Sequence, residues 1–253
     1  MVRKLLLSLL KVVNKFGYKL VKIHDKAFED QFLFVDPKDD LVIFDIGSNV
    51  GDTVQKYKSF CPGAEIHSFE AIPKIMDIQN EKFHSDPNVH VNNLAISDEP
   101  GTFTYKVNKY QDTSSLLDAN RDFLPDRYGD IYDIAYEVAI QMTTIDAYCQ
   151  SKKIESIDIV KMDIQGAELK ALKGAHDLLT NGKIKILFLE CLFLPFYENQ
   201  AFFSDLVVHL AKYNYHFHYF YNISSNFNTG KPMYCDSIFI HDSLRDKADY
   251  GKI

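Results

Sequence analysis

Several short, largely apolar runs in the chain end at an acidic residue. Three of them cover residues 41–44, 64–69 and 157–162, and the acids that follow them are Asp45, Glu70 and Asp163. Runs of this length with β-branched residues are typical of strands buried on both faces of a parallel sheet. A polar stretch with helical character follows each of these runs. The pattern therefore predicts strands that alternate with helices.

The remaining pattern extends this prediction over most of the chain. Further helices are predicted at residues 52–60, 74–83 and 202–213, and further strands at residues 89–91, 102–107, 137–142, 183–190, 215–221 and 235–240. The last two strands have no helix between them, which predicts an antiparallel C-terminal hairpin. The fold class is thus α/β, with a doubly wound, Rossmann-like, mostly parallel sheet. In such a sheet residues 157–162 lie beside the first strand, so Asp163 faces the same crevice as the first strand's end.

Residues 45–53 predict the corner where that first strand turns into a helix. Gly47 and Gly51 flank Ser48 and Asn49, and both of these polar residues are good helix N-caps. A buried strand, a glycine turn and a helix start form the ligand-binding corner of doubly wound sheets. Glycine allows a ligand to approach the backbone more closely than a Cβ atom permits.

The residues around this corner indicate which ligand it binds. The spacing Gly47-x-x-x-Gly51 departs from the dinucleotide fingerprint, and the P-loop lysine is absent. Asp45 suits an ammonium group, and Glu70 suits the hydroxyls of a ribose. A ribose joined to an amino acid without phosphate is S-adenosylmethionine. A Rossmann-like corner with solvated acids is the alternative, and an NAD-dependent dehydrogenase is disfavoured by the glycine spacing.

Composition limits the class of partner. The chain has 253 residues and a net charge of −7, which fits one α/β domain and argues against a general nucleic-acid binder. The four cysteines form no C-x-x-C pair and are interpreted as core thiols of a cytoplasmic protein, without a role as zinc ligands or disulfides.

The chain divides into three parts. Residues 1–40 are predicted to form a helical extension, residues 41–241 the main domain and residues 242–253 a tail. Within residues 1–16, leucines face one side and lysines the other, and Lys11 interrupts the apolar run too early for a signal peptide. This helix either packs on the domain or lies on an anionic membrane surface as a weak peripheral contact. The polar residues 108–135 are predicted to form a functional loop or lid, or else to be disordered.

Five motifs, in order, resemble the FkbM family of methyltransferases. They are D-I-G-S-N-V-G at 45–51, F-E-A-I-P at 69–73, N-L-A-I-S-D at 93–98, S-S-L at 114–116, and K-M-D-I-Q-G-A-E at 161–168 followed by L-K-G-A at 172–175. The resemblance implies a seven-stranded class I methyltransferase sheet and S-adenosylmethionine as the cofactor. Two residues depart from the family pattern: many members have proline where this chain has Ala71, and glutamate where it has Gln165.

The resemblance also implies roles for single residues. Asp45, Gly47, Ser48, Asn49 and Gly51 are expected on the methionine side, Glu70 and Ala71 at the ribose, Asn93 and Ala95 near the adenine, and Asp163 at the same cofactor site.

Methyl transfer to a hydroxyl requires a base within hydrogen-bond reach. Asp163 is the first candidate and Glu168 the second, although capping the next turn or helix explains either carboxylate. Ser114 and Ser115 are candidates for contacts with the acceptor. His67 and His90 are interpreted as core or surface histidines, and a divalent metal is left open.

The sequence thus predicts an O-methyltransferase that acts on a sugar, a glycan intermediate or another small hydroxylated metabolite. The alternative is a catalytically silent, methyltransferase-like subunit of a glycan-synthesis complex. Either protein would be cytoplasmic, and either could work at the inner face of the membrane.

Overall fold

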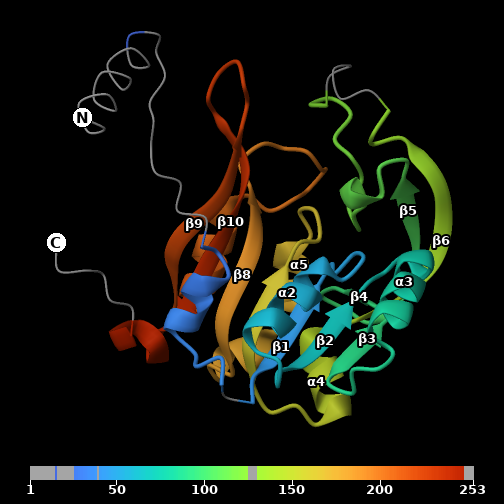
Figure 1. Cartoon of the computed structure of the whole chain (residues 1–253). Coiled ribbons are helices and arrows are strands. Elements are labelled where there is room, and N and C mark those ends of the chain that lie inside the picture. The colour runs from blue at the N-terminus through green and yellow to red at the C-terminus, as the bar shows by residue number, and fades with distance from the viewer. Residues whose placement is uncertain (1–14, 16–25, 39, 125–129, 248–253) are drawn as a thin grey trace, which may run out of the picture.

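A computed structural model describes residue 15 and residues 26–38, 40–124 and 130–247, and it contains the predicted doubly wound sheet (Figure 1). The strand order is β3-β2-β1-β7-β8-β10-β9, and of these strands only β10 runs against its neighbours. The strands are β1 (Val42–Ile46), β2 (Glu65–Phe69), β3 (Val89–Asn92), β7 (Ile157–Met162), β8 (Ile184–Leu192), β9 (Tyr215–Ser225) and β10 (Pro232–His241). The order reverses between β1 and β7, which places the switch point where the sequence predicts it.

Helices cover both faces of this sheet because successive side chains of a strand point to opposite sides. Phe44 of β1 packs into the core that includes α4, α5, α6 and α7, whereas Ile43 packs into the core that includes α2. The helices are α2 (Asp52–Phe60), α3 (Pro73–Phe83), α4 (Ile145–Lys152), α5 (Glu168–Lys173), α6 (His176–Thr180) and α7 (Phe203–Ala211). The sheet is therefore buried on both faces, as the apolar runs predict.

A second, three-stranded sheet lies beside the first and was not predicted from the sequence. Its order is β4-β6-β5, formed by β4 (Ala95–Ile96), β5 (Gly101–Asn108) and β6 (Ile134–Thr143). The segment between β5 and β6 contains a short 3-10 helix, η2 (Gln111–Thr113), and its backbone pairs with the main domain where Ala119 bridges Tyr197. The described part of the predicted loop is thus held against the main domain.

Residues on both sides of the predicted domain boundaries belong to the same core. Phe28 and Phe34, which flank the 3-10 helix η1 (Glu29–Leu33), are buried with Leu244 of η4 (Asp242–Lys247). The described part of the predicted extension and of the predicted tail therefore packs on the main domain. The predicted helix at residues 1–16 lies outside the described residues, apart from residue 15. Among the described residues, no helix has the length and apolar character that a membrane crossing requires.

Candidate cofactor and acceptor site

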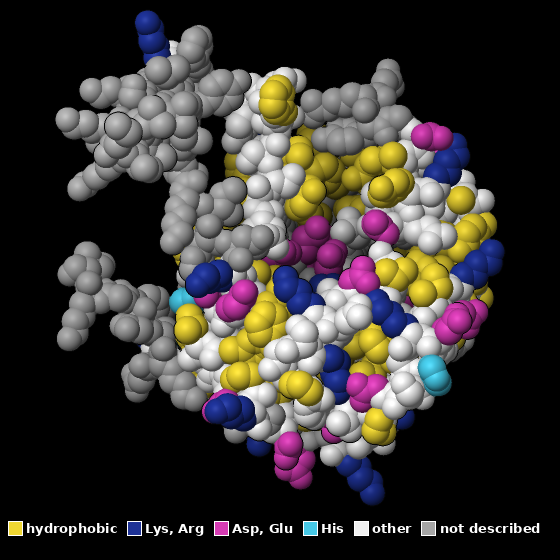
Figure 2. Space-filling view, viewed as in Figure 1, with side chains coloured by type: hydrophobic (Ala, Val, Ile, Leu, Met, Phe, Trp, Pro, Cys, Tyr) yellow, Lys and Arg dark blue, Asp and Glu magenta, His cyan; other side chains and the backbone are white. Residues whose placement is uncertain are grey.

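A crevice opens at the carboxyl ends of β1, β2 and β7, next to the switch point. It encloses about 900 Å³, part of which is open to solvent. Figure 2 shows acidic and hydrophobic side chains together in the hollow between the β9–β10 hairpin and the β5–β6 strands. We call this hollow the cofactor crevice. Seven of the predicted site residues line it: Gly47, Asn49, Glu70, Ala71, Ala95, Ser114 and Asp163.

Gly47 holds the first corner against the end of β7. Its φ of +75° is in the left-handed region, and a Cβ atom there would lie 2.0 Å from the backbone oxygen of Asp163. The backbone N–H of Gly47 also donates to the carbonyl of Phe69 at 3.0 Å. Only glycine allows the ends of β1 and β7 to approach this closely, so Gly47 shapes the crevice as well as lining it.

Gly51 and Ser48 lie behind the crevice wall. Gly51 has a φ of +80°, and a Cβ atom there would lie 2.5 Å from the ring of Phe83 in α3. The Ser48 hydroxyl donates to the carbonyl of Phe69 at 3.1 Å and accepts from Gln79 of α3 at 2.8 Å. The structure therefore gives both residues a packing role between the corner and α3, where the sequence predicted direct contact with the cofactor.

Asp45 is placed differently from its predicted position at the tip of the first strand. β1 continues to Ile46, so the pleat turns the Asp45 side chain into the interior, where it is fully buried. Its carboxylate lies 3.2 Å from the Nζ of Lys161, and that ammonium group donates to the carbonyl of Gly47 at 3.1 Å. Burial alone would lower the pKa of Lys161, but the charges of Asp45 and Asp163 outweigh it and hold this pKa above its usual range. Asp45 therefore acts on the crevice through Lys161.

Glu70 joins the first corner to the second. Its two carboxylate oxygens accept from the backbone N–H groups of Asn49 at 3.0 Å and Ile72 at 2.8 Å. Burial raises the pKa of Glu70, and these two N–H groups oppose that shift. An ionised carboxylate offers about four acceptor positions, so two remain for a ligand. Asn93 does not line the crevice; its amide donates to the carbonyls of Glu70 and Ala71 at 2.8 and 2.9 Å and supports them from behind.

Asp163 and Gln165 form the wall of the crevice at the end of β7. Gln165 is in the left-handed region with a φ of +57°, and its side-chain amide donates to Asp163 at 2.9 Å and to Glu190 at 3.0 Å. Its amide oxygen accepts from the hydroxyl of Tyr197 at 2.9 Å. Burial, reinforced by the charge of Asp163, raises the pKa of Glu190 well above its usual range. Glutamine at position 165 thus supplies the N–H donors that these two acids share, and a glutamate there would not.

Glu168 lies behind this wall and does not line the crevice. It is 1% exposed, and its carboxylate accepts from the backbone N–H of Ile164 at 2.9 Å. Burial raises its pKa to about 7. The structure therefore favours the turn-capping role of Glu168 over the role of a base that reaches the substrate.

We expect Glu168→Gln to change how stability depends on pH. The folded protein keeps the Glu168 proton up to about pH 7, whereas the unfolded chain loses it near its ordinary pKa of 4.5, so wild-type stability falls across this window. The full effect is about 3 kcal/mol. Glutamine keeps the acceptor for Ile164 and carries no charge. The variant should match the wild type near pH 4.5 and be more stable at pH 8.

Urea unfolding at both pH values measures this difference, with the exposed Glu155→Gln as the control. Equal stability of Glu168→Gln and wild type at pH 8 would show that Glu168 is not held protonated in the fold.

The two serines of the predicted loop lie on different sides of one wall. Ser114 lines the cofactor crevice, and its hydroxyl accepts from the backbone N–H of Asn108 at 3.0 Å. Ser115 lines a second, adjoining hollow, and its hydroxyl donates to the carbonyl of Gln165 at 2.8 Å. We call this second hollow the polar crevice. It encloses about 630 Å³ and is lined by Lys106, Asn108, Ser115, Leu117, Asp118, Ala119, Arg121, Tyr132, Ile134 and Glu198.

The structure adds residues that sequence reasoning did not assign to the site. Asp112 lines the cofactor crevice and accepts from the side-chain amide of Asn49 at 2.8 Å, which ties the loop to the first corner. An apolar wall consists of Phe69, Ile72, Ile75, Leu94, Ile96, Tyr105, Leu116 and Ile164. Leu94 and Ile96 belong to the N-L-A-I-S-D motif at 93–98, which was a signal in the sequence, whereas nothing local distinguished Asp112 from other loop acids.

The strand order, the reversed β10 strand and the crevice at the switch point define a class I, S-adenosylmethionine-dependent methyltransferase domain. The model of the methyltransferase FkbM domain matches residues 45–217, which is more than half of the chain. The chain therefore belongs to the FkbM methyltransferase family.

Individual known proteins also resemble the chain, at low sequence identity. The 2-O-methyltransferase NoeI of Sinorhizobium fredii (strain NBRC 101917 / NGR234) is 27% identical over 169 residues, which is 64% of this chain and 68% of that protein. Fibrillarin of Aeropyrum pernix, solved with S-adenosyl-L-methionine, has a TM-score of 0.45 and 11% identity, covering 85% of this chain and 73% of its own. Magnesium protoporphyrin IX methyltransferase of Synechocystis PCC 6803 has a TM-score of 0.45 and 12% identity, covering 86% and 78%. The fold assignment rests on the sheet order.

Proposed function

We propose that this protein transfers the methyl group of S-adenosylmethionine to a hydroxyl group of a sugar or glycan intermediate. The observation that carries the proposal is the pair of adjoining crevices, which share the wall formed by Ser114 and Ser115. One crevice has the acids and the apolar wall that a nucleoside with an amino-acid tail requires. The other is lined mainly by polar and charged side chains, which suit a ligand with several hydroxyl groups.

The cofactor crevice offers a partner for each part of S-adenosylmethionine. Glu70 has acceptor positions left for the ribose hydroxyls. The backbone at Gly47 and the side chain of Asn49 lie at the methionine end, and the apolar side chains of Ile72 and Leu94 provide a surface for the adenine ring. The bound cofactor supplies an activated methyl group on a sulfonium.

Asp163 is the residue that we assign to the acceptor proton. Its Oδ1 is held by Gln165 at 2.9 Å, and Oδ2 would accept the proton as the acceptor oxygen takes the methyl group and the sulfur–methyl bond breaks, which leaves S-adenosylhomocysteine. The acceptor hydroxyl must reach Asp163 in the cofactor crevice for in-line displacement, in which orientation supplies much of the rate. The 2-O-methyltransferase activity named for the Sinorhizobium fredii relative is consistent with a hydroxyl acceptor.

Mass spectrometry of candidate acceptors tests this function. Nucleotide-linked sugars and lipid-linked glycans are incubated with the protein and S-adenosylmethionine, and one acceptor is expected to gain a methyl group. Retained cofactor binding without methylation of any sugar or glycan would instead support a methyltransferase-like binding subunit.

The cofactor assignment gives a separate prediction at Glu70. Glu70→Gln removes the charge and one acceptor, and a charge-assisted hydrogen bond of about 1.5–3 kcal/mol corresponds to a roughly 10- to 150-fold weaker Kd. Calorimetric titration with S-adenosylhomocysteine measures the loss, and the exposed Glu99→Gln is the matched control. Unchanged affinity in Glu70→Gln would show that Glu70 does not bind the ribose. Tight binding of NAD by the wild type would show that NAD, and not S-adenosylmethionine, is the cofactor.

A further inference from the structure

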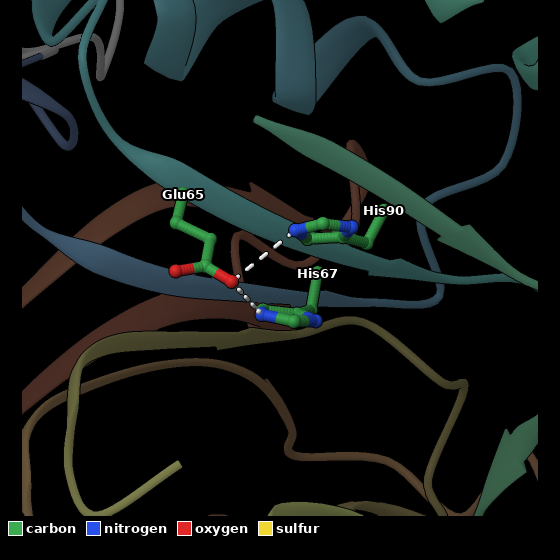
Figure 3. Close-up of side chains that lie close together, drawn as sticks. All are labelled: Glu65, His67 and His90. Atoms are coloured by element: carbon green, nitrogen blue, oxygen red, sulfur yellow. Dashed lines mark hydrogen bonds and ion pairs between the residues drawn. The ribbon is translucent and has the colours of Figure 1, made fainter. Parts of the chain in front are cut away.

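Glu65, His67 and His90 lie together at the amino-terminal end of β2 and β3, and the mechanism does not use them (Figure 3). Glu65 and His67 are two residues apart on β2 and point to the same face, and the strand register pairs His67 with His90 on β3. Glu65 begins β2 and Glu70 follows its end, so along the strand Glu65 lies about 16 Å and His67 about 10 Å from Glu70 of the crevice. It is therefore separate from the methyl-transfer site.

The spacing of the three groups matches the ligand shell of a transition metal. Oε1 of Glu65 lies 3.1 Å from Nε2 of His67 and 3.2 Å from Nε2 of His90. The three ligand atoms all lie within 4.8 Å of one another. Zinc bonds of about 2.0–2.2 Å in tetrahedral geometry place neighbouring ligands about 3.3 Å apart. The side chain of His90 is 44% exposed, so its ring has room to turn toward the ion.

Hydrogen bonds around His67 fix which of its ring nitrogens carries the hydrogen. The amide nitrogen of Asn92 donates to the carbonyls of Ser68 at 3.1 Å and His90 at 2.9 Å, so Oδ1 of Asn92 must be the acceptor of its other contact. Tyr148 donates its hydroxyl proton to that Oδ1 at 3.1 Å. Because the hydroxyl has no second proton, Nδ1 of His67 must donate to the Tyr148 oxygen at 2.9 Å.

In neutral His67 this arrangement leaves the Nε2 lone pair facing the carboxylate of Glu65. Two acceptors then lie 3.1 Å apart without a hydrogen between them. A cation gives both acceptors a shared partner. Metal-binding histidines characteristically donate their other ring N–H to a fixed acceptor, as His67 does to Tyr148.

We propose that Glu65, His67 and His90 form a binding site for a divalent transition-metal ion, with Zn²⁺ as the best match and water as the remaining ligand. Imidazole and carboxylate together suit Zn²⁺ better than Mg²⁺ or Ca²⁺, which prefer oxygen.

The ion would be structural, because it joins β2 to β3 and reaches α4 through Tyr148. The ring of Tyr148 packs on Phe69 with centroids 4.8 Å apart, and Phe69 lines the cofactor crevice. Metal binding would therefore also stabilise one side of that crevice.

The test uses the metal-free full-length chain without a histidine tag, titrated with Co²⁺ as a spectroscopic probe and with Zn²⁺ by calorimetry. We expect tetrahedral d–d absorption from the wild type. His90→Ala removes an exposed ligand and should weaken binding at least about tenfold, and Tyr148→Phe, which removes the acceptor for Nδ1, should weaken it about 10- to 100-fold. The exposed His84→Ala is the matched histidine control. Asp163→Asn tests whether the ion binds in the cofactor crevice instead. Both should bind like the wild type.

Two outcomes would overturn the site. The first is a wild-type protein that gives no tetrahedral spectrum and no calorimetric signal at millimolar metal, in which case the cluster only forms hydrogen bonds. The second is equal affinity in His90→Ala and wild type, which would place the ion elsewhere in the chain.

Discussion

Asp163→Asn is expected to lower the rate of methyl transfer about 10²- to 10⁴-fold, the usual contribution of a general base. Asparagine keeps the shape of the side chain at the end of β7 and can still bond to Gln165, but it cannot take up the acceptor proton. Affinity for the cofactor and the melting temperature should change little, because the carboxylate lies on the crevice wall and is not buried as Asp45 is.

Turnover, cofactor affinity and melting temperature are measured together on this variant. Near-normal turnover would mean that Asp163 only caps the turn after β7, since asparagine caps almost as well. A collapse of cofactor affinity would move Asp163 from the acceptor to the cofactor. Chelator added to the His90→Ala variant, which lacks a ligand of the proposed β2–β3 metal site, separates a metal-assisted reaction, because activity there is sensitive to chelator only if the reaction itself requires a divalent ion.

Gly47→Ala is expected to destabilise the fold by roughly 2–6 kcal/mol, from left-handed backbone strain and overpacking together. The added Cβ would lie 2.0 Å from the backbone oxygen of Asp163, and backbone atoms cannot move aside as a flexible side chain can. Separation of β1 from β7 would also widen the crevice at its base. Cofactor affinity should therefore fall together with stability.

Gly63→Ala is the matched control for this substitution. Nothing lies within 4 Å of a Cβ atom at Gly63, so its effect should stay within about 0.5 kcal/mol. Urea unfolding compares the two variants. Gly47→Ala with an unchanged midpoint would mean that the contact between the ends of β1 and β7 relaxes without cost.

The sequence could not show which strand-end acids reach the crevice, because this depends on where each strand ends. Asp45 and Asp163 both follow apolar runs, and sequence reasoning treated them alike. β1 includes Asp45 and extends to Ile46, whereas β7 stops at Met162, so the first acid is buried beside Lys161 and the second reaches the crevice. The strand register pairs Asp45 with Lys161, so Asp163 lies two residues farther along, past the end of the sheet, and this offset decides which acid meets the ligand.

The sequence by itself determined the alternation of strands and helices, the glycine corner and the hairpin at the end, because periodicity and turn residues are local properties. Tertiary structure alone decided the three-stranded β4-β6-β5 sheet, the division of Ser114 and Ser115 between two crevices and the meeting of His67 with His90. These features depend on which distant segments pair and in which register. The free energy of such pairing comes from burial across the whole domain, and no local pattern records it.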